Sequence, residues 1–213
     1  IVTGGASGIG AETAKVFAEH GATIVICDVN AALGQSIADG IATDGGSAIF
    51  RPLDVTDEDR WAALVAETEK TYGKLDVLTN IAGISGRDPQ QNIQTTMTAG
   101  GTLEDQTLEK WNQIMSVNAT GTFLCTRASL PGMLERGWGR VINVESAAGL
   151  RGGRHIAAYV ASKHAQTGLT KALAVEVGSG GMTANALCPG YADTPITDLS
   201  VRNLVAKTGG TRA

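Results

Sequence analysis

Tyr159 and Lys163 are the two residues whose types and spacing point most directly to chemistry. They stand four residues apart in a segment that predicts a helix from Tyr159 to about Val177, so their side chains share one helical face. A free tyrosine loses its proton at about pH 10, and a neighbouring ammonium group stabilises the phenolate and lowers that pKa. The pair is therefore a candidate for proton transfer at neutral pH, although the same spacing also occurs by chance on many helix surfaces.

Ser146 precedes Tyr159 by 13 residues and follows the apolar run from Arg140 to Val144, which predicts a strand. Ligands of open parallel sheets bind at the carboxyl ends of the strands, and a serine there can meet a substrate. We expect Ser146 to donate a hydrogen bond to a substrate oxygen or to accept one from it. The alternative is an ordinary serine in a loop of small residues.

Asn118 lies on one helical stripe with Trp111, Ile114 and Met115. An amide on an apolar stripe must find hydrogen-bond partners once it is buried. Two interpretations of Asn118 are open. It is either a structural clasp or a residue that holds a water and so supports a proton relay towards Lys163.

A glycine-rich turn from Thr3 to Gly10 separates the first predicted strand from the first predicted helix. Glycine permits tight turns and a close approach of the backbone to a ligand, and the free amides and dipole at a helix start favour a pyrophosphate. The order of strand, turn and helix favours a dinucleotide site over a turn without a ligand. The residues expected to contact the cofactor here are Gly4, Ser7, Gly8, Ile9 and Gly10.

Asp28 ends the second predicted strand, 18 residues after Gly10. An acidic side chain in this place accepts hydrogen bonds from the adenosine ribose hydroxyls. A 2′-phosphate would meet Asp28 as a like charge, and neither Ser7 nor Val29 supplies a compensating cation, so the sequence favours NAD over NADP. The alternative is that Asp28 only caps the next helix.

Short apolar strands alternate with amphipathic helices along the whole chain, a pattern typical of βαβ units. We therefore predict an α/β fold with a doubly wound, Rossmann-like parallel sheet, helices on both of its faces, and a single domain over residues 1–213. The expected strands cover residues 1–3, 23–27, 47–53, 75–81, 140–144 and 183–187.

Two of the predicted helices have recognisable ends. Gly21 ends the first, and Thr56 begins the one that follows the third strand, where Thr56-Asp57-Glu58-Asp59 resembles a capping box. The first helix is expected to present Ile9, Thr13, Val16 and Phe17 on one stripe. The later helix is expected to bury Trp61, Leu64, Val65, Thr68 and Tyr72.

Composition excludes several classes of protein. Hydrophobic residues make up 43% of the chain and charged residues 18%, which is typical of a globular protein. The net charge of −4, without a basic stripe, argues against nucleic-acid binding, and no apolar run is long enough to span a membrane. Cys27, Cys125 and Cys188 lack metal-ligand spacing, so we expect no metal site, a reducing compartment and core packing for these residues.

Residues 85–106 interrupt the alternation with a polar stretch rich in Gln and Thr, which we expect to be a surface excursion. Both ends of the sequence lack complete elements. We therefore expect the chain to be a fragment, truncated at both ends, or the ordered part of a longer protein.

Together these motifs resemble the short-chain dehydrogenase/reductase superfamily over nearly the whole chain. The shared features, in family order, are Gly4-x3-Gly8-x-Gly10, Asn80-Ile81-Ala82-Gly83, Asn118, Ser146, Tyr159-x3-Lys163 and Pro189-Gly190. The resemblance implies hydride transfer between NAD and a small-molecule secondary alcohol or ketone, with Tyr159 as general acid and base. A hydroxyacyl, a steroid-like and a sugar-like substrate all stay open. The resemblance also implies a cytoplasmic homodimer or homotetramer, paired through helices within 111–136 and 159–177.

The resemblance assigns further cofactor contacts. They are Asp54 and Val55 at the adenine, Asn80, Ala82 and Gly83 beneath the adenosine ribose and in support of the central sheet, the backbone of Pro189 and Gly190 at the nicotinamide, and Thr194 at its carboxamide. The substrate end of the pocket is expected from Leu150, Arg151, His155, Ile156 and residues 191–199. Arg151, Arg154 and His155 either bind an acidic substrate or are solvated loop charges.

The sequence departs from the family pattern in three places. Glu145 stands where the family has a small or hydroxyl residue, and it either disturbs the site or points into solvent. The excursion at 85–106 is longer than the usual connection and could reach the substrate mouth. The final helix and strand of the family are absent after Ala213.

Two alternatives to a working dehydrogenase or reductase follow. Glu145 and the missing end would fit a catalytically inactive nucleotide-binding homologue. A sugar-nucleotide epimerase or dehydratase shares the tyrosine and lysine pair, but the glycine spacing and the short chain argue against it.

Overall fold

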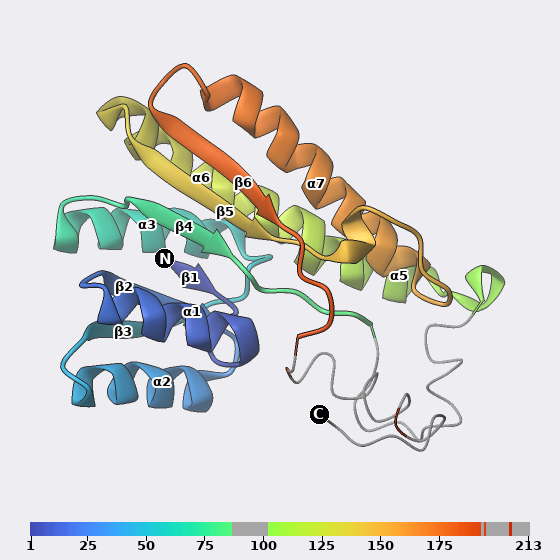
Figure 1. The fold of residues 1–213 in the computed structure, drawn as a ribbon, viewed down its shortest axis with the longest axis horizontal. Helices are drawn as coiled ribbons and strands as arrows, with labels where there is room; N and C mark the ends of the chain where they lie inside the picture. The colour runs from blue at the N-terminus through green and yellow to red at the C-terminus, as the bar shows by residue number, and fades with distance from the viewer. Residues whose placement is uncertain (87–101, 193, 195–204, 206–213) are drawn as a thin grey trace.

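The computed structural model describes residues 1–86, 102–192, 194 and 205, and it centres on a six-stranded parallel sheet (Figure 1). The strand order is β3-β2-β1-β4-β5-β6. Strands β1 to β3 are added outward on one side of the sheet, and strands β4 to β6 are added outward on the other side. This is the doubly wound, Rossmann-like topology that the sequence predicts. The strands are β1 (Val2–Thr3), β2 (Thr23–Asp28), β3 (Ser47–Pro52), β4 (Val77–Asn80), β5 (Gly139–Val144) and β6 (Met182–Leu187).

Helices connect the strands and cover both faces of the sheet. The α-helices are α1 (Gly8–Glu19), α2 (Ala31–Thr43), α3 (Glu58–Tyr72), α5 (Leu108–Met115), α6 (Gly121–Arg136) and α7 (Ala157–Val177). Three short turns join them: η1 (Leu103–Asp105), a π-helical turn η2 (Ser116–Thr120) and η3 (Ala147–Gly149). Within the described residues, no helix combines the length and the apolar character needed to cross a bilayer.

Two hydrophobic clusters lie on the opposite faces of the sheet, and β2 contributes to both. Ile24 and Ile26 pack with α1 and α2, whereas Val25 and Cys27 pack with residues of α3, α6 and α7. Successive side chains of a strand point to opposite faces, so a strand that is covered on both sides reads as a continuous apolar run.

The first helix buries a different stripe from the predicted one. Its buried residues are Gly10, Ala11, Ala14 and Ala18, while Val16 is 46% exposed. The predicted stripe of Ile9, Thr13, Val16 and Phe17 was wrong in part, because the fully buried face of α1 consists of glycine and alanine. Phe17 is half-buried and packs against the cluster, whereas Val16 is exposed.

The predicted cap of α3 also needs correction. Asp57, not Thr56, caps the helix, because its side chain accepts a hydrogen bond of 3.1 Å from the Arg60 amide. The Thr56 hydroxyl instead donates to Asp54 Oδ1 at 2.8 Å, so the helix begins one residue later. Four of the five predicted core residues of this helix are buried, and Tyr72 is 38% exposed.

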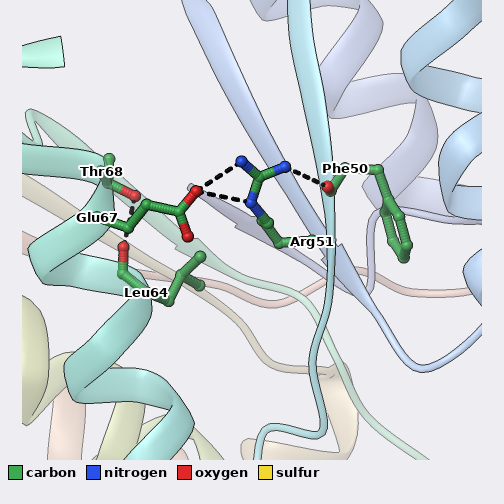
Figure 2. A network of polar contacts seen from close by, with 5 residues as sticks. All are labelled: Phe50, Arg51, Leu64, Glu67 and Thr68. Carbon is green, nitrogen blue, oxygen red and sulfur yellow. Dashed lines mark hydrogen bonds and ion pairs between the residues drawn. The ribbon is translucent and has the colours of Figure 1, made fainter. Parts of the chain in front are cut away.

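A polar contact attaches α3 to strand β3 at the surface. Figure 2 shows the Arg51 guanidinium donating to Glu67 on α3 and to the carbonyl of Phe50. The distance from Arg51 Nε to Glu67 Oε1 is 2.9 Å. Both charged side chains are more than a third exposed, so solvent screens the pair and its contribution to stability is small.

The expected excursion at 85–106 lies mostly outside the described residues. At its end, the side chain of Gln106 accepts a hydrogen bond of 3.2 Å from the Ala158 amide in the first turn of α7. This bond attaches the end of the stretch to the helix that carries Tyr159.

Two glycines of α2 provide a matched test of the packing between α2 and β3. A Cβ at Gly34 would lie 2.1 Å from a ring carbon of Phe50, whereas a Cβ at Gly40 would meet nothing within 4 Å. We expect Gly34→Ala to lower the free energy of unfolding by about 1–3 kcal/mol through overpacking. Gly40→Ala should raise it by about 0.5–1 kcal/mol because alanine favours the helix. Urea denaturation followed by circular dichroism measures both, and effects of the same sign would contradict this packing.

Candidate active site

A cavity of about 680 Å³ opens at the carboxyl ends of the strands. The segments that follow all six strands contribute to its wall, together with the first turns of α1 and α7. Because parallel strands end at one edge of the sheet, residues that are far apart in sequence meet there (Figure 1).

The cavity gathers most of the predicted site residues. Those that line it are Gly4, Ser7, Gly8, Ile9, Gly10, Asp28, Asp54, Val55, Ala82, Gly83, Ser146, Tyr159, Lys163, Pro189, Gly190 and Thr194. Asn80 and Asn118 are 2% and 0% exposed and lie behind the wall. The Asn80 amide donates to Asn143 and Thr126, so Asn80 supports the sheet, as the resemblance implied, and does not reach the cavity surface.

The glycine turn packs so tightly that a side chain at either of two positions would collide with neighbouring backbone. Gly4 has a φ of +65°, and a Cβ there would lie 2.8 Å from the Ala82 amide nitrogen. A Cβ at Gly10 would lie 2.0 Å from the Gly4 carbonyl oxygen. Ser7 precedes α1 without forming a capping hydrogen bond, and the first turn of α1 holds no acidic side chain. The amides and the dipole of this helix start are therefore well suited to an anionic group.

Asp28 holds the glycine turn against the end of β2. Its two carboxylate oxygens accept hydrogen bonds from the amides of Ala6, at 3.1 Å, and Asn30, at 2.9 Å. The cap of α2 is Asn30, whose side chain accepts from the Leu33 amide, so the interpretation of Asp28 as a mere helix cap was wrong. Each Asp28 oxygen keeps acceptor capacity towards the cavity.

Asn118 forms a clasp between three elements. In the π-helical turn η2, its Oδ1 accepts from the Ile84 amide at 2.8 Å, and its Nδ2 donates to the Ile84 carbonyl and to Ser162 Oγ, both at 2.9 Å. The Ser162 hydroxyl in turn donates to the carbonyl of Tyr159 at 2.8 Å. Of the two open interpretations of Asn118, the structural clasp is observed, and a part in a proton relay stays a prediction.

Lys163 reaches across the cavity floor to the end of β5. Its side chain is 3% exposed, its Nζ donates to the Val144 carbonyl at 3.2 Å and lies 5.8 Å from the centre of the Tyr159 ring. Burial lowers the pKa of Lys163 to about 8, while electrostatic interactions with Glu145 and then Cys188 act in the opposite direction. The ammonium of Lys163 is therefore costly to bury but electrostatically supported.

Ser146 stands at the start of η3, directly after Glu145. Its Oγ accepts a hydrogen bond of 3.1 Å from the Ala148 amide, which leaves the hydroxyl proton available to donate into the cavity. The next amide, of Ala147, donates to the Pro189 carbonyl at 2.9 Å and joins the loops after β5 and β6.

Glu145 does not point into solvent, which excludes one of the two expectations for it. The residue is 4% exposed and its carboxylate accepts hydrogen bonds from the hydroxyls of Thr167, at 2.5 Å, and Thr170, at 2.9 Å. The thiol of Cys188 is a third donor, at 3.6 Å. These partners hold the carboxylate between β5 and α7.

Sequence reasoning missed one further positioning residue, Thr3. Its hydroxyl accepts from the amides of Ile81, at 3.0 Å, and Ala82, at 3.1 Å, and so holds the segment after β4 against the glycine turn. A hydroxyl between an apolar strand and a glycine turn is the only hint in the sequence, and its partners are 78 and 79 residues away.

The substrate end of the cavity is only partly as expected. Arg151, Ile156, Tyr191 and Ala192 line it, together with Gln113, which the sequence did not suggest. Among the described residues, Leu150, which is 63% exposed, and His155 do not belong to its wall. Residues 195–199 lie outside the described part of the chain.

A fold of this topology with this cavity defines a Rossmann-type nucleotide-binding protein, and comparisons with known proteins narrow the class. The short chain dehydrogenase family matches residues 1–204. The 3beta-hydroxysteroid dehydrogenase of Mediterraneibacter gnavus is 41% identical over 94% of this chain and 68% of its own length. The D-beta-hydroxybutyrate dehydrogenase of Rhizobium meliloti is 35% identical over 94% of this chain and 74% of its own length.

A solved structure shares the whole fold. The crystal structure of a variant of actinorhodin polyketide ketoreductase with NADPH has a TM-score of 0.86 and is 36% identical in sequence. The match covers 99% of this chain and 76% of the ketoreductase chain. The chain belongs to the short-chain dehydrogenase/reductase family. It is an oxidoreductase that acts on CH–OH groups with a nicotinamide cofactor.

The buried ammonium of Lys163 predicts a pH dependence of stability. The pKa is about 8 in the folded protein and 10.5 for an ordinary lysine, so between these values unfolding takes up a proton. Above pH 10.5 Lys163 is neutral in both states and its burial does not reduce the free energy of unfolding. As the pH falls from 10.5 towards 8, the unfolded state gains a proton and the free energy of unfolding falls. We expect the free energy of unfolding to rise with pH across this window in the parent protein relative to Lys163→Met. Parallel slopes for the two proteins in urea denaturation would contradict the assignment.

Proposed function

We propose that the protein is an NAD-dependent dehydrogenase or reductase of a small-molecule secondary alcohol or ketone, with Tyr159 as its general acid and base. The observation that carries this proposal is the meeting of Tyr159, Lys163 and Ser146 in one cavity with the glycine turn and Asp28. Hydroxyacyl, steroid-like and sugar-like substrates remain candidates. The relatives named above act on a hydroxysteroid and a hydroxybutyrate, which makes both compounds useful probes.

The dinucleotide fits the residues on three grounds. The start of α1 has no side-chain cap, Gly4 and Gly10 permit a tight turn that a Cβ would disrupt, and Asp28 stands beside the turn with acceptor capacity. In this arrangement Gly4, Ser7, Gly8, Ile9 and Gly10 hold the pyrophosphate, and Pro189, Gly190 and Thr194 border the nicotinamide end. When bound, the nicotinamide supplies the acceptor or donor of the hydride.

The chain's own residues move the proton and orient the oxygen. In oxidation, Tyr159 takes the hydroxyl proton as the carbinol C–H bond breaks and the C–O bond becomes C=O, and in reduction it returns the proton. Ser146 donates a hydrogen bond to the substrate oxygen. Lys163 stabilises the phenolate through its ammonium, and Asn118 fixes Ser162 and hence the first turn of α7.

Asp28 supports NAD as the preferred dinucleotide. Its carboxylate lies beside the glycine turn, and a 2′-phosphate at the adenosine ribose would meet this charge. Val29, which also lines the cavity, brings no cation to offset it.

The inactive-homologue alternative loses one of its supports. Glu145 was the residue that set this site apart from working members of the family, and its carboxylate is held by α7 and Cys188. Glu145 is part of the cavity wall, and these partners engage its carboxylate oxygens.

We further propose a cytoplasmic homodimer or homotetramer. Exposed apolar side chains on α6 and α7, among them Phe123, Leu134 and Val175, support pairing through these helices. All three cysteines lie in the described part of the chain and are free thiols, as expected in a reducing compartment. Cys27 and Cys125 are buried, and burial raises the pKa of Cys27 to about 12.

Tyr159→Phe tests the mechanism. The variant keeps the ring but cannot exchange a proton, so we expect turnover to fall by at least about 100-fold. A panel of secondary alcohols and hydroxyacyl thioesters is screened with NAD, and NADH formation is followed by absorbance. Tyr72→Phe, on α3 away from the cavity, is the matched control and should retain the parent's rate. If Tyr159→Phe turns over as fast as the parent, Tyr159 is not the acid and base.

Asp28→Asn tests the dinucleotide preference. Removing the charge should lower the ratio of kcat/KM with NAD to kcat/KM with NADP by about tenfold, because the repulsion of the 2′-phosphate is lost. Asp44→Asn, which removes a charge at the far end of α2, should leave the ratio unchanged. A parent that prefers NADP would refute the proposal for NAD.

A further inference from the structure

We propose that Glu145 is a positioning residue for the proposed proton transfer, because its buried carboxylate is the counter-ion that keeps Lys163 protonated beside Tyr159. The inference rests on the proposed function of the Tyr159 and Lys163 pair. It assigns a role to the residue that departs most from the family pattern.

The backbone brings the two charges to the same place. Lys163 Nζ donates to the carbonyl of Val144, the residue that directly precedes Glu145. Glu145 and Lys163 are 4% and 3% exposed, so neither charge is well solvated by water. A buried ammonium and a buried carboxylate in one site stabilise each other's charged form.

One face of α7 is built to receive the carboxylate. Lys163, Thr167 and Thr170 follow one another at helical spacing, so α7 presents a cation and two hydroxyl donors on the side that meets β5. The hydroxyls of Thr167 and Thr170 donate to different oxygens of Glu145. This geometry fixes the carboxylate one turn along the helix from the lysine.

A chain of donors ends on Glu145. The Asn80 amide donates to Asn143 Oδ1 at 2.9 Å, the Asn143 amide donates to the Thr170 hydroxyl at 2.8 Å, and that hydroxyl donates to Glu145. The network joins β4, β5 and α7, and it ends on the Glu145 carboxyl group.

Among the described residues, Glu145 is the carboxylic acid that faces Lys163, beside two weaker acids. The end of β5 brings Glu145, the segment after β6 brings Cys188, α7 brings Tyr159, and η2 brings the neutral amide of Asn118 near Gly83. Burial raises the pKa of the Cys188 thiol and Glu145 raises it further, so the thiol is neutral at physiological pH. Burial alone favours a neutral Lys163, and the carboxylate offsets that effect.

Glu145→Gln removes the charge and keeps the shape. Both threonines retain an acceptor in the variant, since Thr167 Oγ1 lies 3.0 Å from the Lys163 carbonyl and Thr170 Oγ1 lies 2.8 Å from the Gln166 carbonyl. We therefore expect the fold to tolerate the change. Glu145→Asp keeps the charge on a shorter side chain, and Glu19→Gln removes a charge from the exposed end of α1 as the matched control.

The first experiment titrates Lys163 directly in the whole protein by nuclear magnetic resonance of 13C-labelled lysine, with Lys163→Met to assign the signal. We expect the pKa of Lys163 to fall by on the order of one unit in Glu145→Gln, to be largely restored in Glu145→Asp and to stay unchanged in Glu19→Gln. An unchanged pKa in Glu145→Gln would overturn the inference.

The second experiment measures the pH profile of alcohol oxidation. Because Lys163 loses its proton at lower pH without Glu145, the alkaline limb of kcat should move to lower pH in Glu145→Gln. A purely structural role would reduce kcat at every pH and leave the limb in place, which would contradict the proposal. The two experiments separate the hypotheses: absence of turnover in the parent with a shifted Lys163 titration refutes the proposed function alone. Turnover that depends on Tyr159 with an unshifted titration refutes only the role of Glu145.

Discussion

Strands β1 and β4 pair side by side although the partners Val2 and Thr79 are 77 positions apart in the sequence. The rest of the molecule depends on this pairing. The Thr3 hydroxyl secures it by accepting hydrogen bonds from two amides beyond the end of β4. Because the chain winds outward in opposite directions from this pair, the loops after β1 and β4 diverge and leave a cavity between them. The left-handed backbone of Gly4 and its close approach to Ala82 are consequences of the same pairing.

The site resolves a conflict between charge and burial. A lysine that is 3% exposed would lose its proton more readily than one in water, yet the proposed chemistry needs it as a cation. The fold surrounds it with a backbone carbonyl and a carboxylate that two threonines hold in place. Buried charges contribute little net stability compared with apolar packing, so we interpret the nearby carboxylate as serving the proposed reaction rather than the fold.

Helix geometry serves the site as well. The five residues of η2 form a π-helical turn between α5 and α6, and Asn118 lies within it. Such turns interrupt the regular hydrogen-bond ladder and are frequent at functional sites. Here Asn118 uses both of its amide hydrogens on Ile84 and Ser162, and thereby joins the loop after β4 to the helix that carries Tyr159. The positions of Tyr159 and of the loop beside the cavity are therefore coupled.

Much of this architecture is local, and the sequence by itself determined it. Short apolar runs predict the buried strands, and glycines that tolerate a tight backbone predict the turn. Helical spacing predicts that Tyr159 and Lys163 share a face. Each of these features depends on neighbours within a few residues. The cap of α3 was misjudged because the Thr56 hydroxyl bonds to Asp54 instead of capping the helix. The buried stripe of α1 was misjudged because its fully buried residues are glycine and alanine. Only the tertiary structure decided the role of Glu145. Its partners Thr167, Thr170 and Cys188 are 22 to 43 residues away, and no local pattern could distinguish a carboxylate held by α7 from one exposed to solvent.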